Sequence, residues 1–250
     1  MHFSDLPERL AEVRGRIAHA AQRGGHGQEA AMTIIAVTKT HGPEAVRAAV
    51  RAGIRDIGEN KVQEALRKQD ELESAGGLDG VRWHLIGHLQ TNKAKSLRRF
   101  ALFHALDRDG LLRAVDAVGT RTSDSSGASA ADVADAPMIA KPIDALVQVN
   151  VLGEESKGGY APDALPALAD RLHEARGITV RGVMTMAPFE AEEAELRAVF
   201  IGARAARDVL RAAGHPAVEL SMGMSGDYEV AVEEGATMVR IGTVLFGERS

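Results

Sequence analysis

The sequence predicts an α/β fold, a single parallel (β/α)8 barrel of the TIM type with one extra helix at its N-terminus. Eight short strand-like segments occur along the 250 residues, and a helix-like segment or the chain end follows each one. Hydrophobic residues make up 45% of the chain and charged residues 26%, which is ample for a barrel core. We therefore expect one domain over residues 1–250.

The expected elements alternate along the chain. An opening helix is expected from about Ser4 to Arg23, with Ser4 as its N-cap, and a Gly-rich turn follows it. The first strand is the short β-branched run 32–39, and Pro43 favours a helix start soon after it. The later strands are expected at 56–58, 82–86, 102–106, 146–150, 180–186, 219–221 and 238–241. The helices between them are expected at 43–52, 61–72, 92–99, 109–118, 162–175, 191–213 and 225–234.

Residues 119–137 do not fit the alternation. They are rich in Ser, Ala, Asp and Gly and carry no apolar period. Such a composition is typical of a flexible surface segment. Because strand and helix patterns resume on both sides, we interpret the segment as an insertion in the barrel and not as a domain boundary.

Composition excludes several classes of function. The formal net charge of −5 gives no basic footprint for nucleic acid, and the absence of cysteine excludes disulfides, thiolate metal sites and cysteine nucleophiles. The polar N-terminus lacks the apolar core of a signal peptide, and no apolar stretch is long enough to span a bilayer. We expect a soluble, cytoplasmic protein. His84 and His88 are four residues apart, but they lie on a strand that enters a Gly turn and lack a third ligand, so no metal is expected.

Lys39 stands at the end of the first predicted strand. In a (β/α)8 barrel, ligands bind at the C-terminal ends of the strands. Lysine amines form Schiff bases, so this placement suggests a cofactor with a reactive aldehyde. Many strands, however, end in a solvated lysine, and Lys39 alone does not distinguish the two cases.

The loops after the seventh and eighth strands suggest a phosphate site. The first reads Ser221-Met222-Gly223-Met224-Ser225-Gly226-Asp227, and the second begins at Arg240-Ile241-Gly242-Thr243. Barrels often bind phosphate in these two loops, because small residues leave backbone N–H groups accessible at a helix start. The alternative is a pair of ordinary turns with a serine N-cap.

Arg240 is unusual because it lies within an apolar strand, where arginine is almost never buried unpaired. It either pairs with a carboxylate or faces a ring nitrogen of a ligand. An arginine at that place keeps a pyridine unprotonated and weakens it as an electron sink. Asn60, His84 and Asn150 are either ring or substrate contacts, or buried groups that the backbone satisfies.

Several segments together resemble the pyridoxal phosphate homeostasis proteins. The resemblance spans nearly the whole chain in order, through residues 36–39, 58–64, 83–93, 149–150, 182–184, 221–227 and 238–247. It implies the fold of the alanine racemase barrel domain (fold type III), without the β-rich second domain. It also implies pyridoxal 5′-phosphate (PLP) bound to Lys39 as an internal aldimine, with Arg240 facing the pyridine nitrogen. By the same resemblance, the phosphate is held by Ser221, Ser225, Gly242 and Thr243, the last two mainly through backbone N–H groups.

The resemblance implies control of free and transferable PLP, with small amines, amino acids or PLP-requiring apoenzymes as partners. We expect a monomeric carrier more than an enzyme. The alternative is a racemase or decarboxylase of weak activity. That chemistry needs an acid or base opposite the lysine. The chain has only Tyr160 and Tyr228, and we expect no second domain to supply a tyrosine, although His84 could serve. A third alternative is a phosphate-binding isomerase in which Lys39 forms an ordinary ion pair. The resemblance leads us to expect a second basic residue near the proline that follows Lys39. The sequence departs from this pattern, because it reads Thr40-His41-Gly42-Pro43 there.

Overall fold

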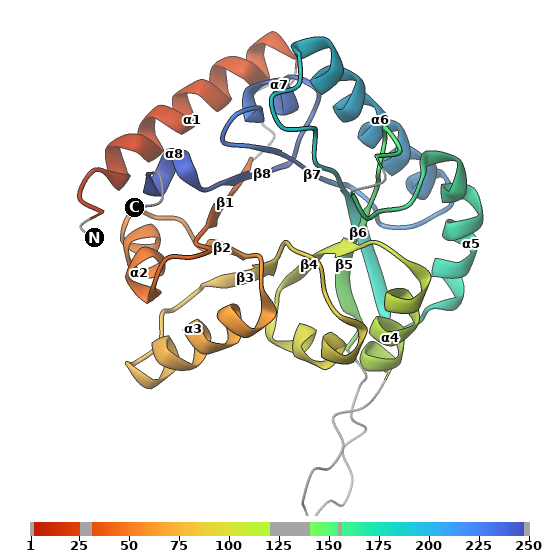
Figure 1. Ribbon diagram of the computed structural model, residues 1–250, viewed down its shortest axis with the longest axis horizontal. Coiled ribbons are helices and arrows are strands. Elements are labelled where there is room, and N and C mark those ends of the chain that lie inside the picture. Colours follow the sequence, from red (N-terminus) through yellow and green to blue (C-terminus); the bar gives the residue numbers. More distant parts are fainter. Residues whose placement is uncertain (1–2, 26–31, 121–140, 155–156, 248–250) are drawn as a thin grey trace, which may run out of the picture.

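The computed structural model describes residues 3–25, 32–120, 141–154 and 157–247. Eight parallel strands pair in chain order, and β8 pairs with β1, so the sheet closes into a barrel. The helices lie around the outside of this barrel (Figure 1). The predicted (β/α)8 architecture is therefore confirmed. No helix of the described residues combines the length and the apolar character that a membrane crossing requires.

The strands are short and mostly buried. They are β1 (Thr33–Val37), β2 (Asp56–Glu59), β3 (Arg82–Leu85), β4 (Leu102–Leu106), β5 (Ile143–Gln148), β6 (Ile178–Met184), β7 (Glu219–Met224) and β8 (Met238–Ile241). The α-helices are α1 (Leu6–Arg23), α2 (Pro43–Arg51), α3 (Val62–Ser74), α4 (Asp109–Thr120), α5 (Leu165–Glu174), α6 (Glu193–Ala212), α7 (Tyr228–Glu233) and α8 (Thr243–Phe246). Two 3₁₀ segments, η1 (Thr91–Arg99) and η2 (Pro162–Ala164), complete the order.

The extra helix α1 covers the outside of the barrel where the chain closes on itself. Leu6, Leu10, Val13 and Ile17 are spaced three or four residues apart and are all buried. This apolar stripe packs over α7 and α8, as Figure 1 shows. The N-terminal helix therefore covers the last two βα units, which carry the predicted phosphate loops.

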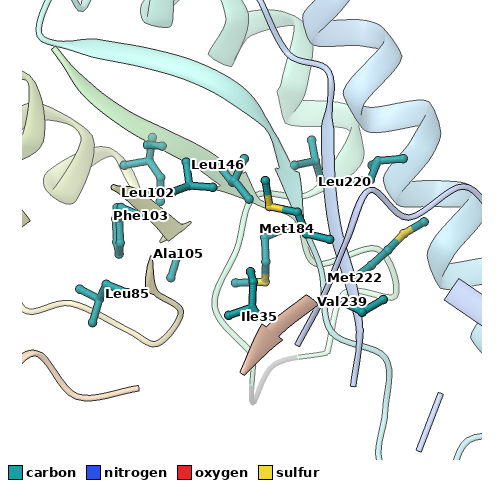
Figure 2. Packing of buried hydrophobic residues seen from close by; sticks show 14 of the residues in the cluster. Ile35, Leu85, Leu102, Phe103, Ala105, Leu146, Met184, Leu220, Met222 and Val239 are labelled. Atoms are coloured by element: carbon teal, nitrogen blue, oxygen red, sulfur yellow. The ribbon is translucent and has the colours of Figure 1, made fainter. Parts of the chain in front are cut away.

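The apolar core fills the interior of the barrel and the layer between strands and helices. Ile35, Leu85, Phe103, Leu146 and Val239 are each no more than 1% exposed, and Figure 2 shows them converging from different strands. Full burial of one such side chain stabilises a fold by about 1.5–3 kcal/mol. Strands that are buried on both faces explain why the sequence shows continuous apolar runs in place of alternation.

Several boundaries differ from the sequence prediction. The expected helix 92–99 is a 3₁₀ segment, whose only buried residues, Ala94 and Leu97, are three apart, as a three-residue turn requires. The fifth strand begins and ends earlier than expected, and the seventh continues to Met224. The expected helix 225–234 is shorter, because it begins at Tyr228.

The predicted insertion at 119–137 begins inside a helix. Gly119 and Thr120 belong to α4, and a Cβ on Gly119 would lie 1.8 Å from the carbonyl oxygen of Gly177. Only glycine permits this close approach between the end of α4 and the start of β6. The rest of the expected insertion lies outside the described residues.

Candidate cofactor site

A cavity of about 730 Å³ opens at the C-terminal ends of the strands. It is lined by residues at or just after the C-terminal ends of β1, β2, β3, β6, β7 and β8. Six of the eight predicted site residues line it, namely Lys39, Asn60, Ser225, Arg240, Gly242 and Thr243. Side chains from positions 39 to 243 of the chain are thus brought into one space, large enough for a drug-sized ligand.

Lys39 is exposed to the cavity, and the residues on both sides of it are held by a buried lysine. Lys68, in α3, donates from Nζ to the carbonyl oxygen of Thr38 at 2.7 Å, to Glu59 Oε1 at 2.6 Å and to Glu64 Oε1 at 2.9 Å. Glu64 Oε1 also accepts the backbone N–H of Thr40 at 2.8 Å. The ammonium of Lys68 therefore has all three hydrogens bonded, and its cluster fixes the backbone around Lys39.

The carboxyl groups of this cluster have shifted pKa values. Burial raises the pKa of Glu59, although Lys68 and Thr38 oppose the shift. Burial acts in the same direction on Glu64, but hydrogen bonds from Lys68 and from the amide of Thr40 outweigh it and lower the pKa of that group. Glu59 Oε2 is buried and has no hydrogen-bond partner among the described residues. Removal of either charge of the buried Lys68–Glu59 pair would therefore leave the other charge without a counter-ion.

Backbone strain is concentrated at this cavity. Thr40 has φ 69° and Glu190 has φ 58°, and they are the non-glycine residues of the described chain with positive φ. Both line the cavity. Non-glycine residues in this conformation persist only where the surrounding structure holds them, which is common at ligand sites.

Asn60 reaches the cavity because a glycine lies beneath it. A Cβ added to Gly87, after β3, would lie 2.2 Å from the carbonyl oxygen of Asn60 and 2.3 Å from its Oδ1. Any larger residue at position 87 would therefore displace Asn60. This close contact explains why glycine occupies the turn after the third strand.

Arg240 is 4% exposed and points from β8 to the floor of the cavity. Its Nη1 donates to the carbonyl oxygen and to Oγ of Ser221 at 2.7 and 2.6 Å, and its Nη2 donates to the carbonyl oxygen of Thr185 at 2.9 Å. Among the described residues, no protein acceptor takes the Nε hydrogen or the second Nη2 hydrogen. Burial lowers the pKa of Arg240 to about 10, so it remains charged at neutral pH. A ring nitrogen of a ligand would satisfy a spare donor.

Ser225 joins the two predicted phosphate loops. Its Oγ accepts the N–H groups of Gly242 and Val244 at 3.3 and 3.4 Å. The loop after β7 and the start of α8 therefore meet at one point of the cavity wall. Asp227 lies at the same wall, and burial raises the pKa of its carboxyl group, although the amide of Met224 and the charge of Arg240 oppose the shift.

Two predicted residues do not line the cavity. Ser221 and His84 are buried within the barrel, and their polar side-chain atoms bond to other protein groups. Ser221 is inside because β7 continues for three residues beyond it, and His84 precedes the last residue of β3. The geometry therefore gives no support to a phosphate contact by Ser221 or a ring contact by His84.

Asn150 and His88 also have protein partners. The Asn150 side chain donates to the carbonyl oxygens of Glu154 and Lys157 and accepts the Glu154 N–H, so it closes its own loop. His88 Nδ1 lies 2.8 Å from Asp107 Oδ2. Sequence reasoning did not identify Lys68, Glu59 or His104. The only sequence signal among these is the i, i+4 spacing of Glu64 and Lys68, which could have indicated an ion pair of Lys68 on a helix.

Comparison with known proteins identifies the family to which the chain belongs. Residues 10–250 match the family model for the N-terminal domain of alanine racemase. The pyridoxal phosphate homeostasis protein of Aquifex aeolicus is 41% identical, covering 97% of each chain, and that of Pseudomonas aeruginosa is 40% identical, covering 99% of this chain and 97% of the relative.

Solved structures show the same fold. PipY of Synechococcus elongatus, solved without PLP, is 34% identical, with a TM-score of 0.79 over 97% of this chain and 100% of PipY. PipY has also been solved with PLP bound, at a TM-score of 0.74. Alanine racemase of Corynebacterium glutamicum is 16% identical and covers 94% of this chain and 62% of its own, at a TM-score of 0.66, which shows the fold alone. The chain thus belongs to the pyridoxal phosphate homeostasis proteins, a family with the barrel fold of the alanine racemase N-terminal domain.

Proposed function

We propose that this protein binds pyridoxal 5′-phosphate in the 730 Å³ cavity and takes part in the intracellular supply of this cofactor. The carrying observation is that Lys39, Arg240 and Ser225 line one cavity at the strand ends. The lysine supplies an amine, the arginine supplies spare donors, and the serine lies where two loops meet. The names of the relatives and the PLP-bound PipY support the assignment.

The chain's own residues divide the ligand between them. Lys39 holds the aldehyde carbon covalently as a Schiff base, which forms when the amine nitrogen adds to the aldehyde and the carbonyl oxygen leaves as water. Arg240 faces the ring nitrogen and stays charged, so the nitrogen accepts a hydrogen bond and is not protonated. Ser225, Gly242 and Thr243 hold the phosphate, and Asn60 contacts the ring. When bound, PLP supplies an aldehyde that combines reversibly with primary amines.

The covalent assignment is tested by borohydride reduction of the PLP-loaded protein, followed by peptide mass spectrometry. We expect the pyridoxyl group on Lys39 and its loss in Lys39→Ala. Lys61→Ala is a matched control, since Lys61 is another exposed lysine, at the start of α3. A label on another lysine, or trapping that survives in Lys39→Ala, would refute the assignment.

The carrier role is separated from an amino-acid racemase by incubating the loaded protein with L-alanine. Within the described residues that line the cavity there is no tyrosine: Tyr160 O–H donates to Asp109, and Tyr228 is 2% exposed and does not line the cavity. We expect no D-alanine by chiral chromatography, together with reactivation of a PLP-requiring apoenzyme by the loaded protein. Clear turnover of alanine would count against the carrier role.

We further propose that PLP-requiring apoenzymes and small amines receive the cofactor, and that the protein acts in the cytoplasm as a monomer. Reversibility of the Schiff base supports transfer to an amine. The monomer is tested by light scattering with and without PLP, where a mass near 26.5 kDa is expected. A mass of twice that value would contradict it.

A further inference from the structure

A series of polar side chains lies inside the barrel between two cavities. The cofactor cavity is bounded by Arg240, and a second cavity of about 920 Å³ on the opposite face is bounded by Asp56. His84, His104 and Ser221 lie between them, are each no more than 3% exposed, and line neither cavity. The proposed function uses Arg240 but leaves the other four without a role.

These side chains are joined by consecutive hydrogen bonds. Asp56 Oδ1 lies 2.9 Å from His84 Nε2, and His84 Nδ1 lies 3.0 Å from His104 Nε2. His104 Nδ1 lies 2.9 Å from Ser221 Oγ, which accepts from Arg240 Nη1 at 2.6 Å. Each ring nitrogen of the two histidines therefore has one partner in the array.

The direction of these bonds follows from the groups at the two ends. A guanidinium only donates, so Ser221 Oγ accepts from Arg240, and the serine hydrogen is free to donate to His104 Nδ1. His104 then carries its hydrogen on Nε2 and donates to His84 Nδ1. His84 in turn carries its hydrogen on Nε2 and donates to Asp56, a carboxylate that accepts. In this arrangement the hydroxyl hydrogen of Ser221 and the Nε2 hydrogen of each histidine have one acceptor each.

The opposite direction leaves a buried group unsatisfied. If His84 carried hydrogens on both nitrogens, His104 Nδ1–H would have to donate to Ser221 Oγ. The serine hydrogen would then have no acceptor among the described residues, which is costly in a buried site. Burial also lowers the pKa of His104 well below its usual value, and the charge of Arg240 acts in the same direction. A neutral His104 is the state that both observations favour.

We propose that Asp56, His84, His104 and Ser221 form one directed hydrogen-bond array, with both histidines neutral and protonated on Nε2, and that this array positions Arg240 for the ring nitrogen of the cofactor. The inference rests on the proposed function, because the ring nitrogen is the ligand atom that Arg240 meets. The four residues are positioning residues and do not touch the cofactor. Their effect is to fix one Nη1 hydrogen of Arg240 on Ser221 Oγ.

The tautomers are tested in the cofactor-free protein, so this part does not depend on PLP binding. Long-range ¹⁵N–¹H NMR of the imidazole rings distinguishes the two neutral tautomers from imidazolium. We expect the Nε2–H form for both His84 and His104 at pH 7. An Nδ1–H form or an imidazolium in either ring would overturn the array, whether or not PLP binds.

The positioning effect is tested by a change at the far end of the array. Asp56→Ala removes the acceptor of His84, and Asp144→Ala is a matched control. Asp144 accepts Arg181 Nε at 2.9 Å much as Asp56 accepts Arg82 Nε at 2.7 Å, but the structure shows no histidine on it. We expect Asp56→Ala to alter the tautomers of His84 and His104, to shift the absorption maximum of bound PLP and to weaken PLP binding about fivefold to tenfold. Asp144→Ala should leave all three unchanged.

The outcomes separate the array from the binding site. Altered tautomers with an unchanged PLP spectrum and affinity would overturn the positioning effect. A wild-type protein that binds no PLP would refute the proposed function, while the tautomers would still decide whether the array exists. If Asp56→Ala does not fold, Ser221→Ala provides the same comparison, with Thr185→Val as control. Thr185 carries a buried hydroxyl outside the array, and its carbonyl contact to Arg240 survives the change.

Discussion

Lys68 Nζ lies 2.7 Å from the carbonyl oxygen of Thr38, the residue immediately before Lys39. The contact joins a fully buried ammonium in α3 to the backbone that presents the exposed lysine. Two lysines that differ greatly in burial thus have different tasks at one site. Lys39 faces the cavity, while Lys68 and its two glutamates hold the backbone on either side of it.

Lys68→Met is expected to destabilise the fold strongly. The change leaves the carboxylate of Glu59 buried without its counter-ion, which typically costs about 3–5 kcal/mol. Urea unfolding monitored by circular dichroism measures the loss. Lys61 is exposed and precedes the first residue of the same helix, α3. Lys61→Met should therefore change the free energy of unfolding by less than about 0.5 kcal/mol.

The double variant Glu59→Gln/Lys68→Met tests the cause of that loss. It should be more stable than Lys68→Met alone, because the uncompensated buried charge is gone. A double variant less stable than either single variant would contradict the pairing.

Gly87→Ala is expected to disturb Asn60. The new methyl group would lie 2.2 Å from the Asn60 carbonyl oxygen, so the loop must shift, at a cost of about 1–3 kcal/mol. PLP affinity, measured by fluorescence titration, should fall as well. Gly110→Ala in α4 is the control, since a Cβ there meets nothing within 4 Å. Equal behaviour of the two variants would contradict the close contact.

The phosphate assignment predicts that pyridoxal binds at least about tenfold more weakly than pyridoxal 5′-phosphate, because charge-assisted hydrogen bonds to the phosphate are absent. Ser225→Ala should reduce this difference by weakening the binding of the phosphorylated form alone. Competition by inorganic phosphate provides a second measurement. An unchanged ratio in Ser225→Ala would place the phosphate elsewhere.

Stability should depend on pH through His104. Burial lowers its pKa in the folded protein, whereas the unfolded chain takes up a proton near pH 6.5. The unfolded state therefore binds more protons as the pH falls below about 6.5. Stability contributed by the neutral ring is complete above that pH and is lost below it, by up to about 1.4 kcal/mol per pH unit.

This dependence is measured as the difference between wild type and His104→Phe in urea unfolding at pH 5.5 and 7.5. The variant should show a shallower decline at low pH, although it is less stable at both. His215, whose pKa is also lowered by burial, remains in both proteins and cancels in the difference. Parallel declines in wild type and variant would contradict a neutral buried His104.

The place of the site could be predicted from the sequence more reliably than its members. Lys39, Asn60 and Arg240 lie at the ends of predicted strands, and the structure brings them to one cavity. Ser221 and His84 do not line this cavity, because strand ends depend on pairing with neighbouring strands. A difference of one or two residues in the position of a strand end decides whether a side chain lines the cavity or lies inside the barrel.

The sequence by itself determined the barrel, through eight strand-like segments that alternate with helix-like segments, and it predicted a ligand site at the strand ends. These are local patterns, which neighbouring residues along the chain specify. Only the tertiary structure decided that Lys68 holds the backbone around Lys39, and that His104 meets Ser221 across 117 positions of the chain. Such contacts arise from closure of the barrel, which brings distant strands together and carries no signal in local periodicity.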